Sequence, residues 1–287
     1  MANDVHMGGF NILPPVVKNL LIINGLFFFA KIVFSYLGID MDAWFGLHYF
    51  GASDFRFWQP LTYMFMHGSF GHLFFNMFAL WMFGNAIENY WGAKKFLIYY
   101  FVTGIGAGLI HYVVLYFQIQ PELATINQFI DAPSIDNFSQ IVSNHKFVYY
   151  QNSPEMIALK DAWTHVVASP DSQRALNDLA GLMVDYREYY LNAHNIVGAS
   201  GAVFGLLLAF GMLFPNAQIY IYFLLPIKAK WFVILYGALE LVYGVTGSQD
   251  GVAHFAHLGG MLFGILLILL WRKKERREQG YTDFYEY

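Results

Sequence analysis

The stretch that decides the fold is NIVGASGAVFGLLLAF, residues 195–210, in which a single serine, Ser200, stands among glycines and alanines. The residues after Ser200 form an apolar run of the kind that spans a lipid bilayer. A serine in such a run is either a small residue that lets helices pack closely or a nucleophile. The rest of the chain has to distinguish these two interpretations.

Composition places the chain among membrane proteins. Of its 287 residues, 57% are hydrophobic and only 13% are charged, whereas a soluble globular chain carries about 25% charged residues. Several apolar runs approach the roughly 20 residues that a membrane helix needs, and the short alternating segments of a transmembrane barrel are not visible. We therefore predict an all-α polytopic protein that contacts the lipid bilayer.

Charge and cysteine content exclude other classes of protein. The net charge is −4, and no basic stripe indicates a nucleic-acid partner. The chain has no cysteine, which excludes disulfides, thiolate metal sites and a cysteine nucleophile.

Six hydrophobic spans can be read, at residues 16–37, 61–83, 96–117, 196–214, 231–245 and 252–271. The long segment between the third and fourth spans is polar, and Ser153 and Ser169 each precede a proline in the pattern of a helix N-terminus. An apolar face at helical spacing follows, formed by Leu176, Leu179, Met183, Tyr186 and Tyr190. We predict spans one to three in residues 1–117, an extracytoplasmic helical insertion in 118–192, spans four to six in 193–272 and a cytoplasmic tail in 273–287.

Basic residues predict the orientation. They lie in alternate connections, at Lys94, Lys95, Lys228 and Lys230, and again at 272–277 after the sixth span. Connections rich in lysine and arginine face the cytoplasm. We therefore expect both termini in the cytoplasm of a multi-pass protein of the cell membrane, specifically a bacterial inner membrane.

Polar and ionisable side chains interrupt the spans, where they are costly and mark functional sites. The second span contains His67, His72 and Asn76, and the sixth begins with His254 and His257. In the predicted orientation, Ser200, His67 and His257 each lie about four to six residues past the outer start of their spans, at a depth of roughly 6–9 Å. A serine and several histidines are thus expected in one layer of the membrane.

Spacing adds a chemical hypothesis. Small-residue pairs, Gly201 with Gly205 and Gly260 with Gly264, let helix backbones approach closely. Spans four and six can then bring Ser200 within reach of His257, so that the imidazole takes the hydroxyl proton as the oxygen attacks.

Two further side chains fit the same reaction. His72 and Asn76 are four residues apart and share one helix face. They can donate hydrogen bonds where negative charge develops on the attacked carbonyl oxygen, and the backbone N–H of Ser200 can add another.

Other polar residues of the spans receive structural interpretations. His111 and His254 are expected to be hydrogen-bonded structural histidines. Glu240, in the fifth span, is expected to pair with another span or to hold water, with no catalytic role assigned.

Three motifs together resemble the rhomboid intramembrane serine proteases: GASGAVFG (198–205), AHLGGMLFG (256–264) and MHGSFGHLFFN (66–76). The resemblance covers nearly all of the chain except the insertion and implies a six-helix fold with lateral entry of substrate. It implies a nucleophile–base dyad without a third, acidic member and without a metal or cofactor. The implied residues are Ser200 as nucleophile, His257 as base, His72 and Asn76 as the oxyanion-stabilising pair, and His67, Phe204, Gly198, Gly201 and Gly260 as supporting residues.

The resemblance also assigns a structural contact to Glu88, at the cytoplasmic end of the second span, and a ring stacked on the catalytic histidine to Phe204. The resulting hypothesis is a serine endopeptidase that cleaves transmembrane protein substrates in or beside their membrane segments. Three alternatives remain: a rhomboid-like binding protein without catalysis, a haem or metal protein with paired histidines, and a transporter. The natural substrate, the oligomeric state and the purpose of the insertion stay open.

Overall fold

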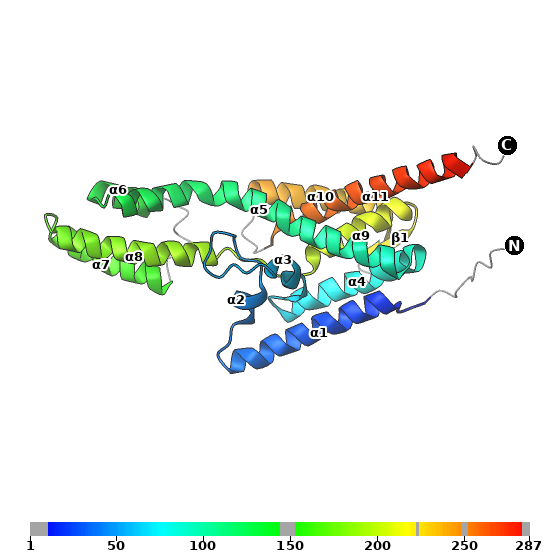
Figure 1. Ribbon diagram of the computed structural model, residues 1–287, viewed down its shortest axis with the longest axis horizontal. Coiled ribbons are helices and arrows are strands. Elements are labelled where there is room, and N and C mark those ends of the chain that lie inside the picture. The colour runs from blue at the N-terminus through cyan, green and yellow to red at the C-terminus, as the bar shows by residue number, and fades with distance from the viewer. Residues whose placement is uncertain (1–10, 144–152, 222–223, 248–251, 283–287) are drawn as a thin grey trace. The chain divides into compact units, whose positions relative to one another are not determined.

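The structure is a computed structural model that describes residues 11–143, 153–221, 224–247 and 252–282. Helices make up nearly all of its regular structure, and one short antiparallel hairpin lies between two of them (Figure 1). The elements are α1 (Pro15–Tyr36), α2 (Met41–Phe45), α3 (Gln59–Thr62), η1 (Tyr63–Phe65), α4 (Phe70–Trp91), α5 (Ala93–Asp131), α6 (Ile135–Ser143), α7 (Pro154–Ala168), α8 (Gln173–Asn192), α9 (Ser200–Leu213), β1 (Gln218–Ile221), β2 (Leu225–Lys228), α10 (Ala229–Thr246) and α11 (His254–Thr282).

The chain forms two compact units. The first, here called the membrane unit, consists of Met1–Leu47, Phe57–His111 and Ile196–Tyr287. The second, the insertion unit, consists of His48–Arg56 and Tyr112–Asn195. The sequence placed the insertion at 118–192, whereas the second unit begins earlier in α5 and also includes a short segment that follows α2.

Five helices of the described chain are long and apolar enough to cross a membrane: α1, α4, α5, α10 and α11. The remaining predicted span is α9, which has only 14 residues and a length of about 21 Å, less than the roughly 30 Å of a bilayer core. Most of its residues are buried, and it packs against α4 and α11. The predicted all-α polytopic fold is confirmed, with α9 as a short helix enclosed by longer ones.

The second span begins later than the sequence indicated. Residues 61–83 were predicted as one span, but the chain forms α3 and η1 and then turns before α4 starts at Phe70. The Ser69 hydroxyl accepts the backbone N–H of His72 at 3.1 Å and caps the new helix, which is a favoured use of serine. His67 therefore precedes α4, while His72 lies in its first turn.

Glu88 joins α4 to the start of α1. Its carboxylate oxygens accept the backbone N–H groups of Val16 and Val17 at 3.0 and 2.8 Å. These N–H groups have no acceptor within their own helix, and the helix dipole favours a negative charge there. The predicted structural contact of Glu88 is thus an interhelical cap.

The insertion unit has a core of large apolar side chains. Leu179, Met183, Tyr186 and Tyr190 of α8 are buried in it, and Leu176 packs against it, which confirms the predicted face. The start predicted at Ser153 is also confirmed, since its hydroxyl accepts the N–H of Met156 at 3.1 Å. The start predicted at Ser169 is wrong. A turn places Ser169 at the end of α7, and Ser172 caps α8 instead.

Candidate active site

Ser200 is the first residue of α9, and the loop before it is held tightly. The N–H of Gly198 donates to the carbonyl of Tyr63 at 2.9 Å. Gly198 has a φ of +133°, a conformation that glycine adopts at little cost. A Cβ atom at Gly198 would lie 2.7 Å from Nε2 of His72, so both the backbone angle and the space require glycine here. The loop therefore holds Gly198 against His72, two residues before Ser200.

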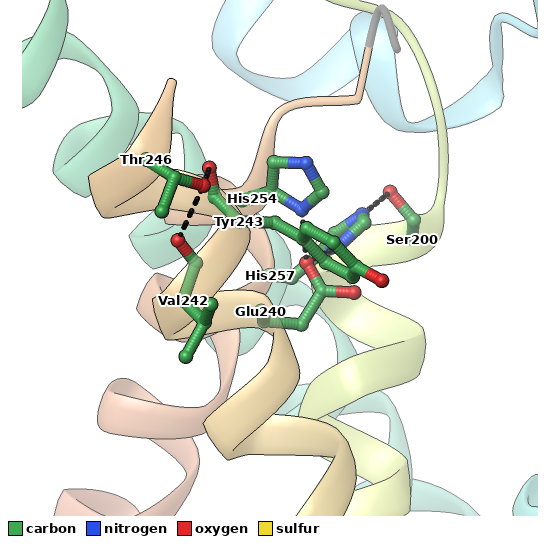
Figure 2. A network of polar contacts seen from close by, with 7 residues as sticks. All are labelled: Ser200, Glu240, Val242, Tyr243, Thr246, His254 and His257. Carbon is green, nitrogen blue, oxygen red and sulfur yellow. Dashed lines mark hydrogen bonds and ion pairs between the residues drawn. The ribbon is translucent and has the colours of Figure 1, made fainter. Parts of the chain in front are cut away.

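His257 lies in the first turn of α11, with its Nε2 atom 2.9 Å from the Ser200 hydroxyl oxygen (Figure 2). The ring of Phe204, one turn after Ser200, stacks on the imidazole with centroids 4.1 Å apart and an angle of 6° between planes. The aromatic face fixes the plane of the imidazole, while the hydroxyl fixes its direction. Both members of the expected pair thus meet at hydrogen-bond distance.

One glycine contact explains how the two helices come so close. A Cβ atom at Gly260 would lie 1.9 Å from the carbonyl oxygen of Gly201, so α11 touches the backbone of α9 directly. The Cα hydrogens of Gly201 and Gly205 point elsewhere, because Cβ atoms there would meet Ala107 and Thr103 of α5. The two small-residue pairs therefore meet where Gly260 contacts the backbone of Gly201, while the Cβ positions of Gly201 and Gly205 face α5.

The expectation that Glu240 pairs with another span is confirmed, but the sequence did not identify the imidazole of His257 as the partner. Oε2 of Glu240, on α10, lies 2.8 Å from Nδ1 of His257 and 2.7 Å from Nδ1 of His254. Glu240, His254 and His257 are all buried, and Figure 2 shows the carboxylate close to both rings. The available signal was the spacing of the histidines, since residues three apart on a helix share a face. His254 is thus hydrogen-bonded, as expected.

The remaining candidates lie before and along α4. His67 is fully buried, and its ring packs edge-on against that of His72 with centroids 5.1 Å apart. The carbonyl of His67 accepts from Nζ of Lys31, which also pairs with Asp42. Asn76 is buried one turn after His72, and its Nδ2 atom has no hydrogen-bond partner within the described part of the chain.

This geometry permits one kind of chemistry directly. A hydroxyl in contact with an imidazole nitrogen, whose other nitrogen contacts a carboxylate, can lose its proton as it attacks an electrophilic carbon. Apolar helices surround the group, so the site belongs to a membrane protein with a serine–histidine pair at the start of a short central helix.

Comparison with known proteins identifies the family. The rhomboid domain matches residues 54–118 and 175–274, which is more than half of the chain. The protein therefore belongs to the rhomboid family. The stretch between the two matched segments, residues 119–174, falls within the insertion unit.

Two curated relatives agree with this assignment. An uncharacterized mitochondrial rhomboid protein of Schizosaccharomyces pombe is 25% identical over 239 residues, which cover 78% of this chain and 54% of the relative. Rhomboid protease GluP of Bacillus subtilis is 37% identical over 58 residues, or 20% of this chain and 11% of GluP. The chain thus spans about half the length of the first relative and about a tenth of the second.

Proposed function

We propose that this rhomboid-family protein is an intramembrane serine endopeptidase that hydrolyses peptide bonds in or beside the transmembrane segments of other proteins. The observation that carries the proposal is the 2.9 Å distance between Oγ of Ser200 and Nε2 of His257. A serine used only for packing needs no such partner. The rhomboid domain match and the similarity to a named rhomboid protease add support at the level of the family.

In the proposed reaction, Ser200 attacks the carbonyl carbon of the scissile bond while His257 takes the hydroxyl proton on Nε2. The resulting tetrahedral intermediate collapses as His257 gives that proton to the leaving amine, and an acyl-enzyme remains. Water then attacks the ester, again with His257 as base, and releases the new carboxyl group. Every proton that leaves one group is taken up by another.

Stabilisation of the oxyanion is assigned to His72, Asn76 and the first turn of α9. The Nδ2 donor of Asn76 is buried and unpaired within the described residues, and an unsatisfied buried donor costs about 1–3 kcal/mol. A developing oxyanion would satisfy it. The N-terminus of α9 has no side-chain cap, so its N–H groups are also available to negative charge.

We also propose that both termini are cytoplasmic and that the insertion unit lies on the opposite side of the membrane. Support comes from the basic connections and from an ion pair between two of them. Nζ of Lys95 lies 2.8 Å from a carboxylate oxygen of Glu275 and 4.7 Å from the ring centre of Trp271. The first turn of α5 and the C-terminal part of α11 therefore share one end of the membrane unit.

The test is labelling of the full chain in detergent with a serine-directed fluorophosphonate, together with cleavage of a reporter transmembrane substrate. We expect the parent protein to be labelled and active. Ser200→Ala should abolish labelling and lower cleavage by about 10⁴-fold or more, because the nucleophile and its base act as a unit. His257→Ala should do nearly the same.

Ser35→Ala is the matched control, since it removes a hydroxyl from another helix of the same unit. Within the described residues, Ser35 donates only to the carbonyl of Ile32. It should leave labelling and cleavage unchanged. Cleavage by Ser200→Ala at the parent rate would refute the mechanism. A folded parent that is neither labelled nor active, yet binds transmembrane helices, would favour a binding protein without catalysis.

A further inference from the structure

We propose that Glu240 is a positioning residue of the active site. It forms a hydrogen-bonded triad with Ser200 and His257, and the three residues lie on α10, α9 and α11. The inference rests on the proposed protease function, because it assigns a role to a residue that acts through His257. A dyad was expected from the sequence, and the structure offers the third group that the dyad lacks.

The first step is the geometry of one imidazole. Nε2 of His257 lies 2.9 Å from Oγ of Ser200, and Nδ1 of the same ring lies 2.8 Å from Oε2 of Glu240. An ionised carboxylate can only accept hydrogen bonds. Nδ1 must therefore carry the ring proton of a neutral His257, which leaves the lone pair on Nε2, facing the serine. This is the tautomer that a general base for Ser200 requires.

The second step concerns charge. When His257 takes the serine proton, its ring becomes an imidazolium. The side chains of His257 and Glu240 are both buried. A positive charge in such a place is costly unless an opposite charge lies close to it. The Glu240 carboxylate is already in contact with the ring, so it stabilises the imidazolium without moving. It keeps its own charge throughout, and the proton passes only between Ser200, His257 and the leaving amine.

The third step is the role of His254. Its Nδ1 atom lies 2.7 Å from the same oxygen of Glu240, and its ring packs against Tyr243 of α10 with centroids 5.5 Å apart. Two N–H donors on one oxygen favour the ionised carboxylate and hold it in place. His254 thus fixes Glu240, which in turn fixes His257. Glu240 lies on α10, and His254 and His257 lie on α11. Their hydrogen bonds therefore also join these two helices at the level of Ser200.

A shared metal ion fits the same three residues less well. Their donor atoms lie within 4.8 Å of one another, and zinc binds histidine and carboxylate ligands at about 2.0–2.1 Å in a tetrahedron, which separates neighbouring ligand atoms by about 3.3 Å. The nitrogen–oxygen distances of 2.7 and 2.8 Å are shorter and have the length of charged hydrogen bonds. The spacing therefore indicates a hydrogen-bonded trio.

The experiment compares Glu240→Gln, Glu240→Asp and His254→Ala with the parent protein in the cleavage assay, with kcat and KM measured separately. Glutamine is neutral, and its amide can donate to Nδ1 and so favour the wrong tautomer. We expect kcat to fall on the order of 10²–10⁴-fold in Glu240→Gln with KM little changed. Glu240→Asp keeps the charge and should recover part of that loss, while His254→Ala should cost about tenfold or less.

Glu88→Gln is the matched control for burial of a carboxylate, because Glu88 caps α1 and is also buried. It should lower thermal stability but leave kcat of the folded protein unchanged. A second readout is ¹⁵N NMR of histidine-labelled protein, with the His257 signal identified by its loss in His257→Ala. We expect the parent ring to carry its proton on Nδ1, and Glu240→Gln to shift the proton toward Nε2.

Two outcomes would overturn the assignment while the protease function stands. One is an active parent whose kcat and His257 tautomer survive Glu240→Gln. The other is loss of cleavage on treatment with a chelator and its return with zinc, which would make the trio a metal site. If the parent itself neither cleaves nor reacts with the fluorophosphonate, the proposed function fails first, and the two failures are thereby distinguished.

Discussion

The membrane unit and the insertion unit are packed in different ways. At the centre of the membrane unit, α11 touches α9 through glycine, with the position of a Gly260 Cβ only 1.9 Å from the Gly201 carbonyl oxygen. The insertion unit instead surrounds its core with large side chains, among them Leu179, Met183 and Tyr186 of α8, all fully buried. Its helices α7 and α8 are not among those apolar enough to span a membrane.

We interpret this difference by the solvent that each unit is proposed to face, lipid for the membrane unit and water for the insertion unit. Burial of large apolar side chains is strongly favourable in water. Between helices in lipid that gain is missing, because the acyl chains are as apolar as leucine, and close packing of small residues takes its place. A catalytic pair carried by two membrane helices therefore depends on small residues that set the distance between backbones. Glycine to alanine should therefore be harmful at the contact between α9 and α11 and stabilising at an exposed helix position of the insertion unit.

The largest effect is expected for Gly260→Ala. The added methyl group would collide with backbone that no side-chain rotation can move, so α9 and α11 must separate or shift. A displacement of about 1 Å can cost 10²-fold in rate, and overpacking typically costs about 1–3 kcal/mol. We therefore expect slower cleavage, slower fluorophosphonate labelling and a lower thermal stability than in the parent protein.

Gly25→Ala controls for the substitution itself within the membrane unit, because nothing lies within 4 Å of the position its Cβ would take on α1. It should leave the rates of cleavage and labelling unchanged. Full activity in Gly260→Ala would mean that close contact of α9 and α11 does not set the distance between Ser200 and His257.

The opposite sign is expected for Gly181→Ala in the insertion unit. Gly181 lies within α8, is exposed, and would place its Cβ in open space. Alanine is preferred over glycine inside a helix by about 0.5–1 kcal/mol. Hydrogen exchange of the α8 amides should therefore slow by about two- to fivefold. Faster exchange in this variant would contradict the comparison.

The same contrast explains what the sequence could predict. The depth of residues along the spans and the spacing of the glycines were sufficient to predict that Ser200 and His257 meet. Depth and spacing depend only on position along a helix, which the sequence gives directly. The role of Glu240 depends on how α10 is rotated about its axis. The residues of α10 around Glu240 are nearly all apolar, so their pattern does not predict that rotation. The packing of Gly201 against α5 could not be predicted for the same reason, because it depends on the rotation of α9. In the insertion unit, the alternation of polar and apolar residues along α8 fixed the buried face.

Local chain turns were predicted less well than helix faces. Ser169 and Ser172 are both good caps, and the choice between them depends on a turn in which the N–H of Ser172 donates to the carbonyl of Ser169 at 3.0 Å. The break before α4 depends likewise on Ser69, which caps the new helix directly after His67 and Gly68. Caps compete over energies of about 1 kcal/mol, whereas a buried face involves several side chains at once.

The smallest effect is expected from a surface contact of the insertion unit, at Glu188. Its carboxylate accepts the backbone N–H of Ser53 at 2.8 Å and a side-chain N–H of Asn192 at 3.1 Å. Hydrogen bonding from Ser53 holds the pKa of the Glu188 carboxyl below its usual value. The unfolded chain then binds the proton more readily, so the contribution is complete above the unfolded pKa of about 4.3 and is lost as the pH falls through the lower, folded value.

Acidification from pH 5 should therefore weaken the hydrogen bond between Ser53, in the segment His48–Arg56, and Glu188 of α8. This part of the pH dependence should be absent in Glu188→Gln. Thermal unfolding and hydrogen exchange of the Ser53 amide, corrected for the intrinsic pH effect, measure it. Asp171→Asn, in the turn before α8, is a control that removes an acid away from Ser53. If the parent and Glu188→Gln lose protection equally between pH 5 and pH 3, the Ser53 contact does not depend on the charge of Glu188. The acid sensitivity of the insertion unit would then have to arise in its other carboxylates.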